Sequence, residues 1–277
     1  MRPPRRERRA EVIEDREAVA RDMRRIILEQ SKRAGVGHIG SALSVADILR
    51  ALYCGAMRID DPDDADRDRF ILSKGHASLA LYAALHLRGW LSEAELDTYC
   101  ADGTLLGTHP EAALRGVDFS TGSLGHGLSL AAGAALAARM QSSPRRVFCL
   151  LSDAELNEGS VWEAVMFAAH HRLSQLVAIV DLNGQQALGY TRDVLDLAPL
   201  RDRWRAFGWD VHEVDGHAPD AIARVIGGLE TTSGPPHVMI AATTFGKGVS
   251  FMEGLIEWHY WPMNNDQFAD ALAEVNA

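Results

Sequence analysis

The second half of the chain alternates between short apolar runs and stretches with helical periodicity, and this alternation limits the possible folds more than any other feature. Strands are predicted at 146–151, 175–182, 209–214 and 237–243. Helical patterns lie between them, at 158–171, 199–207 and 218–230. Near-continuous apolar strands that alternate with helices are typical of a parallel sheet covered on both faces. The sequence therefore predicts an α/β fold with a parallel sheet and helices on both faces.

The first half is predicted to be mostly helical. A helix is expected at 15–34, and a second at 45–56 with Ser44 as its N-cap. No strong linker interrupts residues 16–277, so one domain is expected there. Residues 1–15 begin with an Arg-rich segment that contains two prolines and no apolar stretch, and we expect a fraying or disordered arm.

Composition excludes several classes of function. The formal net charge is −10, which argues against a nucleic-acid partner because phosphate binding needs clustered Lys and Arg. No apolar stretch approaches the roughly 18 residues that span a bilayer, so no membrane association is expected. The three cysteines, Cys54, Cys100 and Cys149, lack metal-binding spacing. An odd number without a signal peptide favours a reducing, cytoplasmic setting.

Polar side chains follow two of the predicted strands. Asp153 comes directly after one apolar run, and Asn183 follows the next run along the chain. Because the carboxyl ends of parallel strands share one edge of a sheet, both residues should face the same crevice. A carboxylate and an amide oxygen suit Mg²⁺, which keeps water and takes further ligands from a substrate phosphate. Asp and Asn also cap helices and form turns after strands, and these two residues alone do not decide between the interpretations.

Glycine-rich loops give further signs of a polar site. The segment "GSLGHG" at 122–127 precedes a helix and offers backbone N–H groups to an anion, although tight packing explains such glycines equally well. Four histidines also lie beside glycines or in Gly-containing loops, namely His38, His76, His109 and His126. Together they indicate a polar pocket lined by loops.

Ordered blocks of sequence carry a more specific signal. They are "GHIGSALSVADIL", "DRFILSKGHASLALYAAL", "GTHPE", "STGSLGHGLSLAAGAALA", "SDAELNEGSVWEAVMFAAHHRLSQLVAIVDLNGQQ" and "TTFGKGVSFMEGLIEWH". From about residue 16 to about residue 261, the chain resembles the N-terminal, diphosphate-binding half of transketolase, a thiamine-diphosphate enzyme. The resemblance covers nearly the whole chain, and the blocks together are far more specific than any single glycine loop.

The resemblance implies a role for individual residues. Mg²⁺ would be held by the side chains of Asp153 and Asn183 and by the backbone carbonyl of Gln185. The residues implied in cofactor binding are Lys74, His76, Gly122, Ser123, Leu124, Asp153, Ala154, Glu155 and Asn183. Those implied in catalysis are His38, His76, His109 and His259, which would hydrogen-bond the ketose donor and shuttle protons.

Three departures from the family pattern stand in this sequence. The metal-binding aspartate of the family has glycine on both sides, and here the neighbours are Ser152 and Ala154. Alanine can replace that glycine if its φ stays negative. Phe245 stands where many relatives have a lysine. Tyr260 and Trp261 follow the last histidine of the motif, and their bulk is expected to reshape the substrate entrance.

The resemblance also implies a partner. A full-length transketolase continues through a pyrimidine-binding domain and a C-terminal domain, and these carry the glutamate that activates the aminopyrimidine of the cofactor. We therefore expect a second subunit that supplies both domains, in an α2β2 assembly. The small-residue helix at 128–138 and the helix after Glu158 are the expected interface elements. Glu158 and Glu163 match acidic positions near the subunit interface.

Three functions remain open at this stage. The leading hypothesis is transfer of a two-carbon ketol unit from a ketose donor to an aldehyde acceptor, through thiamine diphosphate and Mg²⁺. The same scaffold would also suit a subunit resembling 1-deoxyxylulose-phosphate synthase or the first component of a 2-oxoacid dehydrogenase. The third possibility is a non-catalytic scaffold whose cofactor loop has decayed at Ser152 and Ala154.

Overall fold

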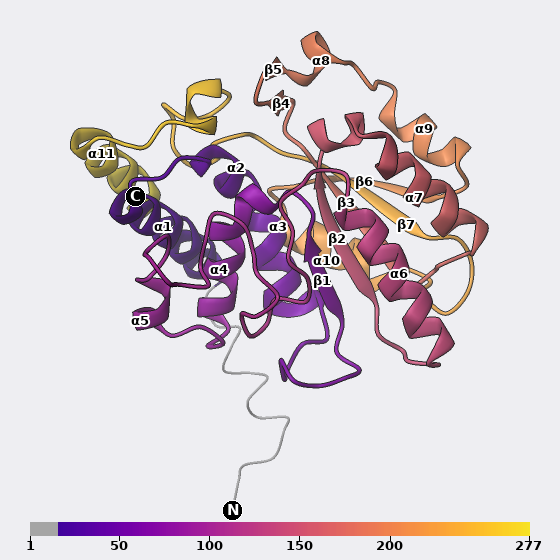
Figure 1. Ribbon diagram of the computed structural model, residues 1–277. Coiled ribbons are helices and arrows are strands. Elements are labelled where there is room, and N and C mark those ends of the chain that lie inside the picture. The colour runs from indigo at the N-terminus through magenta and orange to yellow at the C-terminus, as the bar shows by residue number, and fades with distance from the viewer. Residues whose placement is uncertain (1–15) are drawn as a thin grey trace, which may run out of the picture.

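The computed structural model describes residues 16–277, and it places a five-stranded parallel sheet at the centre of the molecule (Figure 1). The expected arm at 1–15 lies outside the described residues. In spatial order the strands are β1 (Arg69–Leu72), β2 (Val147–Ser152), β3 (Leu176–Leu182), β7 (His237–Ala242) and β6 (Asp210–Asp215). All four pairings are parallel, which confirms the predicted α/β fold.

Helices cover both faces of the sheet, as expected for parallel strands. One face carries α1 (Arg16–Ala34), α3 (Ala46–Ala51), α4 (Ser78–Leu87) and α10 (Pro219–Gly227). The other carries α6 (Gly127–Met140), α7 (Gly159–His170) and α9 (Leu200–Ala206). The remaining α-helices of the described residues are α2 (Ile39–Ser44), α5 (Glu93–Leu96), α8 (Thr191–Val194) and α11 (Asn265–Asn276), the last of which packs on α1.

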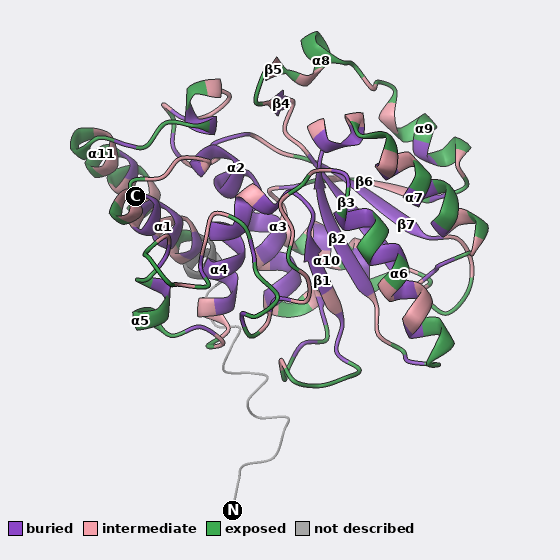
Figure 2. Cartoon of the chain, viewed as in Figure 1, coloured by how far each residue is buried: buried purple, intermediate pink, exposed green. Residues whose placement is uncertain are grey.

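Alternate residues of each central strand point into two separate apolar cores. In β2, Phe148 and Leu150 join the core that contains α1 and α4, whereas Cys149 and Leu151 join the core beneath α6 and α7. Figure 2 shows β2 and β3 as buried strands between the two helical layers. Because a strand changes face at every residue, this pattern fixes the register and therefore which residues reach each strand end.

The helix predicted at 45–56 is broken into shorter pieces. A helix, α2, already occupies Ile39–Ser44, and a wide turn at Leu52–Ala56 follows α3. The prediction that Ser44 caps a helix is wrong, because Ser44 is the last residue of α2. Its hydroxyl instead donates a hydrogen bond to the Asp181 carboxylate at 2.8 Å. The other long helices and the strands lie within a few residues of their predicted bounds.

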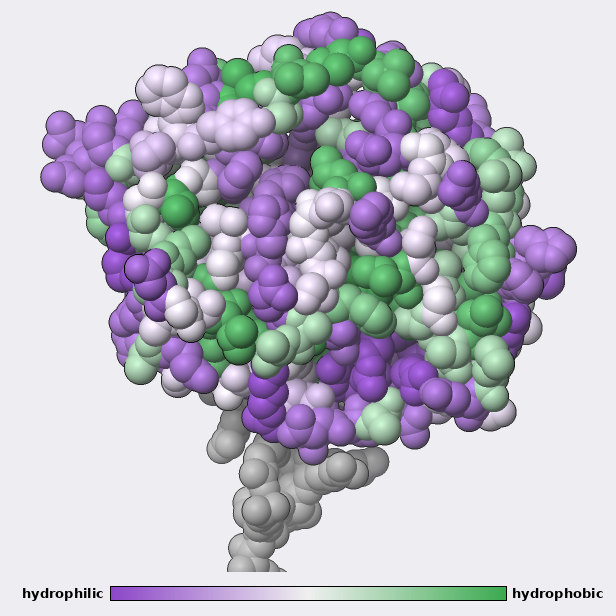
Figure 3. Space-filling view, in the orientation of Figure 1, coloured by the Kyte–Doolittle hydropathy of each residue, from purple (hydrophilic) through white to green (hydrophobic). Residues whose placement is uncertain are grey.

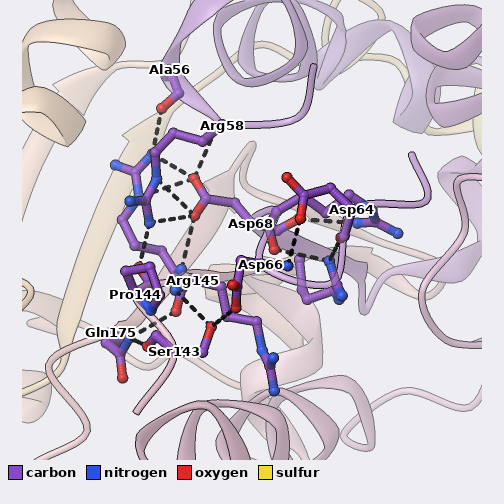
Figure 4. A network of polar contacts seen from close by, with 12 residues as sticks. Ala56, Arg58, Asp64, Asp66, Asp68, Ser143, Pro144, Arg145 and Gln175 are labelled. Carbon is purple, nitrogen blue, oxygen red and sulfur yellow. Dashed lines mark hydrogen bonds and ion pairs between the residues drawn. The ribbon is translucent and has the colours of Figure 1, made fainter. Parts of the chain in front are cut away.

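A buried carboxylate fixes the amino edge of the sheet, in the charged loop before β1. Asp68 is fully buried and accepts hydrogen bonds from the side chains of Arg58 and Arg146 (Figure 4). Burial acts to raise the pKa of Asp68, but the hydrogen bonds from the two arginines outweigh it and hold the pKa below its usual range. The network ties the loop to the start of β2. It lies at the amino ends of the strands, opposite the edge where the strands have their carboxyl ends.

No helix within residues 16–277 is both long enough and apolar enough to cross a membrane.

Candidate functional site

A cavity of about 400 Å³ lies at the carboxyl edge of the sheet, where the loops after β1, β2, β3 and β7 meet. In the space-filling view, polar side chains surround a hollow below the upper rim, and hydrophobic side chains gather on that rim (Figure 3). The lining residues include His38, Ser41, Lys74, His76, His109, Gly122, Leu124, Ala154, Asn183, Gln185, Phe245, His259 and Tyr260. Most of the residues proposed for the site from the sequence therefore come together.

Asp153 follows β2 directly, as the sequence predicts, and it lines a neighbouring pocket with Thr191 and Leu195 rather than the cavity itself. Its carboxylate accepts hydrogen bonds from the backbone N–H groups of Ala154 at 2.9 Å and Gly184 at 2.8 Å. Burial and the nearby Asp181 carboxylate raise the pKa of Asp153 to about 7. A buried carboxylate that two N–H groups only partly stabilise is a strong candidate for a cation ligand.

The two residues that replace glycine beside Asp153 fit without backbone strain. Neither Ser152 nor Ala154 is among the described residues with positive φ. Ala154 instead begins a short 3-10 turn, Ala154–Asn157, and the hydroxyl of Ser152 accepts a hydrogen bond from the N–H of Glu155. The condition set for alanine at this position, a negative φ, is therefore met.

Asn183 and Gln185 lie beside Asp153, after the neighbouring strand β3. The side-chain oxygen of Asn183 accepts a hydrogen bond from the N–H of Gln185 at 2.9 Å. The Gln185 side-chain oxygen, which is buried, has no hydrogen-bond partner, and the same is true of the Asn157 side-chain oxygen. Both residues line the cavity, and unsatisfied buried oxygens fit a hard cation and its water shell. The residues present therefore suit Mg²⁺.

Asp181 is a second buried carboxylate at this edge, and it was not predicted from the sequence. Asp181 is fully buried in β3 and accepts hydrogen bonds from Ser44, Lys74, Asn183 and Thr243. These donors come from α2 and from the loops after β1, β3 and β7. An acid inside the apolar run "QLVAIVDL" was the available signal, since a buried charge requires partners.

The ion pair between Asp181 and Lys74 gives a first prediction. Both side chains are fully buried, with the two charged atoms 2.5 Å apart. Asp181→Asn leaves the Lys74 ammonium unpaired, and we expect a loss of about 3–5 kcal/mol in the free energy of unfolding. Urea denaturation measures this loss. The double variant Asp181→Asn/Lys74→Met should recover part of the lost free energy of unfolding, because it also removes the unpaired charge of Lys74.

The control for this prediction is an exposed ion pair. Arg201 and Glu213 approach to 2.7 Å with about half of each side chain exposed. Glu213→Gln should cost no more than about 1 kcal/mol. Equal losses in Asp181→Asn and Glu213→Gln would show that the buried pair does not hold the edge together.

The loop at Gly122–Leu124 lies against the cavity wall, and its position depends on Glu155. Glu155 is fully buried, and its carboxylate accepts hydrogen bonds from Ser73 and from the N–H of Gly125. It is not among the residues that line the cavity. The structure therefore places Glu155 behind the loop, where it joins the end of β2 to the start of α6. Ser123 is exposed and lines a shallow groove beside the cavity.

Three histidines form a triangle in the cavity. The ring centroids of His38, His76 and His259 lie 5.4–5.6 Å from one another. Burial lowers the pKa of all three, with nearby positive groups acting in the same direction, and the pKa of His259 falls to about 4. Neutral imidazoles can accept as well as donate a proton at neutral pH, which suits groups that bind and relay hydroxyl protons.

The fourth histidine and the hydroxyl of Ser41 complete the polar wall. His109 is exposed at the mouth of the cavity, and a Cβ atom added to Gly122 would lie 3.1 Å from its ring. The Nε2 atom of His76 lies 2.9 Å from the Ser41 hydroxyl. The loop glycine therefore allows His109 to approach the wall closely, and Ser41 orients His76.

Aromatic side chains form the remaining wall. Phe245 is buried and stacks on His259, with ring centroids 5.9 Å apart and planes 8° from parallel. Tyr260 is 54% exposed, yet its ring contacts His38 and His259 at the cavity mouth. Trp261 is 69% exposed and does not line the cavity. Of the two bulky residues, only Tyr260 is placed to shape the entrance.

Comparison with known proteins agrees with this geometry. Residues 15–275 match the family model described as "Transketolase, thiamine diphosphate binding domain". The chain belongs to the transketolase family and corresponds to its thiamine-diphosphate-binding domain.

Its relatives include short transketolase subunits. The Phocaeicola vulgatus relative is named as an apulose-4-phosphate transketolase subunit, and it is 41% identical over 95% of both chains. The 6-deoxy-6-sulfo-D-fructose transketolase subunit SqwG of Clostridium sp. is 42% identical, over 91% of this chain and 93% of that protein. Human transketolase is 37% identical over 90% of this chain, and the match spans only 40% of the human protein.

Solved structures give the same result for the fold. Transketolase from Leishmania mexicana superposes with a TM-score of 0.89 at 28% identity, over 95% of this chain and 41% of that chain. Transketolase from Campylobacter jejuni gives a TM-score of 0.86 at 29% identity, over 96% and 43%. The chain thus spans about two fifths of the length of these transketolases.

Proposed function

We propose that this protein is the diphosphate-binding subunit of a two-component transketolase, which transfers a two-carbon ketol unit from a ketose to an aldehyde. The observation that carries the proposal is the gathering of Asn183 and the histidine triangle around one cavity, with the Asp153 carboxylate held next to Asn183 by the N–H of Gly184. The cofactor, when bound, supplies the carbanion chemistry of ketol transfer, and the protein supplies position and electrostatics.

The anionic end of the cofactor would be held at the sheet edge. Asp153, Asn183 and Gln185 would hold Mg²⁺, and the charge of the cation would offset that of the diphosphate. The N–H groups of the loop before α6 and the ammonium of Lys74 would add positive potential nearby. Because Lys74 is already paired with Asp181, it acts chiefly by orienting the edge rather than as a free positive charge.

The substrate end would be formed by the imidazoles. His38, His76 and His259 have lowered pKa values and are neutral at neutral pH, so each can hydrogen-bond a ketose hydroxyl and hold or pass a proton. His109 at the mouth would contact the more distant part of the donor. Phe245 packs behind His259 and keeps its ring in one orientation.

A second subunit is required by this proposal. The relatives named as apulose-4-phosphate transketolase subunits have nearly the same length as this chain, whereas the long transketolases extend well beyond the matched region. The outward sides of α6 and α7 expose the large apolar residues Leu130, Met166 and Phe167, with Glu163 exposed beside them. Such a surface suits a partner. The simplest symmetric assembly is α2β2.

The proposal is tested by calorimetric titration of thiamine diphosphate in the presence of Mg²⁺. The titration is made into this chain alone, and then into its mixture with the product of the neighbouring open reading frame. We expect weak binding by the chain alone and tight binding by the pair, because the cofactor would lie between the two subunits. Absence of binding in both states would contradict the proposal and favour a non-catalytic scaffold.

A further inference from the structure

The amino edge of the sheet gathers two histidines and one aspartate, far from the cavity. Asp210 and His237 are the first residues of β6 and β7 and are paired in register. His212 lies two residues after Asp210, on the same face of the strand. One oxygen of Asp210 and one nitrogen of each histidine lie within 4.8 Å of one another. The cavity is at the other end of β7, roughly 17 Å away along the strand.

The hydrogen bonds of His237 show what this cluster requires. His237 is 3% exposed, and its Nε2 atom lies 2.8 Å from the backbone carbonyl oxygen of Glu230. A carbonyl oxygen only accepts hydrogen bonds, so the Nε2 atom of His237 must carry a hydrogen. In the neutral ring, Nδ1 then has no hydrogen and can only accept. That Nδ1 atom faces the Oδ2 atom of Asp210 at 3.2 Å. Two acceptors in this arrangement need a proton or a metal ion between them.

The third residue of the cluster favours the metal ion. The Nε2 atom of His212 lies 3.1 Å from the same Asp210 oxygen. Bonds of about 2.0–2.1 Å to a tetrahedral zinc ion put neighbouring ligand atoms about 3.3 Å apart, close to both separations. His212 is partly exposed, so its ring can turn to bring the two histidine nitrogens closer together. The Glu230 carbonyl would be the outer acceptor that zinc-bound histidines almost always have.

We propose that Asp210, His212 and His237 form a second metal site, specific for a divalent transition-metal ion such as Zn²⁺. Two imidazoles and one carboxylate suit zinc better than magnesium, which prefers oxygen ligands. The Asp210 side chain is 49% exposed, so water can fill a fourth position. Bound metal would join the edge strand β6 to β7 and would stabilise the folded chain by mass action. The site is independent of the cofactor edge and of the proposed function.

The test is calorimetric titration of Zn²⁺ into the full chain, with excess Mg²⁺ present to occupy the oxygen ligands at Asp153. One saturable Zn²⁺ per chain is expected, together with a rise in melting temperature. In His212→Gln the Kd should rise about 100-fold or more, since loss of an outer-shell partner alone costs about 10–100-fold. Asp210→Asn should have a similar effect. Both substituted side chains are partly exposed, so folding should survive.

Two control variants carry the same chemical changes at exposed sites. His170→Gln on α7 and Asp202→Asn on α9 should leave the Zn²⁺ affinity unchanged. Cobalt used in place of zinc gives a second readout, because tetrahedral Co²⁺ absorbs visible light. His212→Gln and Asp210→Asn should lose that absorption, and the two control variants should keep it.

Two results would overturn the proposal. In the first, no saturable Zn²⁺ binding is found, and the cluster is then a protonated histidine paired with Asp210. In the second, Zn²⁺ binding persists in His212→Gln and Asp210→Asn but is lost in Asp153→Ala, so the metal occupies the cofactor edge instead. Neither result bears on ketol transfer, so this proposal and the proposed function fail separately.

Discussion

Asp153→Ala is expected to abolish Mg²⁺-dependent binding of thiamine diphosphate by the assembled enzyme. Asp153 is the buried carboxylate of the proposed metal site, and the other proposed protein ligands are uncharged oxygens of Asn183 and Gln185. Removal of one partner from a buried charged contact costs about 3–5 kcal/mol, which corresponds to roughly two to four decades in affinity. Calorimetry with and without Mg²⁺ measures the change.

The matched control is an exposed aspartate that is not a proposed metal ligand. Asp193 is exposed on α8, and Asp193→Ala should bind the cofactor as the unchanged chain does. Asp153→Ala itself should remain folded, because the substitution relieves the burial and the repulsion from Asp181 that disfavour a charged carboxylate at this position. Unchanged affinity in Asp153→Ala would remove the metal assignment from this residue.

The purified chain alone is expected to show no ketol transfer, and addition of the partner should produce it. The activating glutamate implied by the family resemblance belongs to the domains that the proposed second subunit would supply. Rate assays with a ketose donor and an aldehyde acceptor are made on each component separately and on the mixture. The activating group of such a site contributes typically 10²–10⁴-fold through acid–base catalysis alone.

The dependence on concentration provides the control. Activity of the mixture should saturate as the partner is added at a fixed concentration of this chain, and size-exclusion chromatography should show a larger complex at the same ratio. Phe167→Glu places a charge on the exposed apolar surface of α7 and should weaken both the complex and the activity together. Robust turnover by the chain without a partner would refute the two-component proposal.

The sheet and its functional edge could be predicted because they follow from local patterns. Apolar runs gave strands of nearly the observed length, and parallel strands bring their carboxyl ends to one edge. Asp153 and Asn183 were therefore expected to lie together, and they follow the paired strands β2 and β3. The buried alanines of α6, which contains the small-residue helix expected at 128–138, pack against the sheet.

The missed features depend on contacts between residues distant in sequence. Ser44 looked like a helix cap, and its actual partner is Asp181, 137 residues away. The resemblance implies that Glu155 binds the cofactor, and in the structure its carboxylate accepts a hydrogen bond from the N–H of Gly125, 30 residues earlier in the chain. The left-handed conformation of His38, with φ 61°, has no local signal either. Sequence periodicity reports which face a residue occupies, not which distant donor it meets.

One wall of the cavity depends on the absence of a side chain at Gly40. A Cβ atom built on Gly40 would lie 2.2 Å from the ring of Phe245, the ring that stacks on His259. The residues at positions 40 and 245 therefore share one packed volume, and a larger side chain at one position requires a smaller side chain at the other. A larger side chain at position 40 would displace the Phe245 ring and, with it, the surface on which His259 stacks.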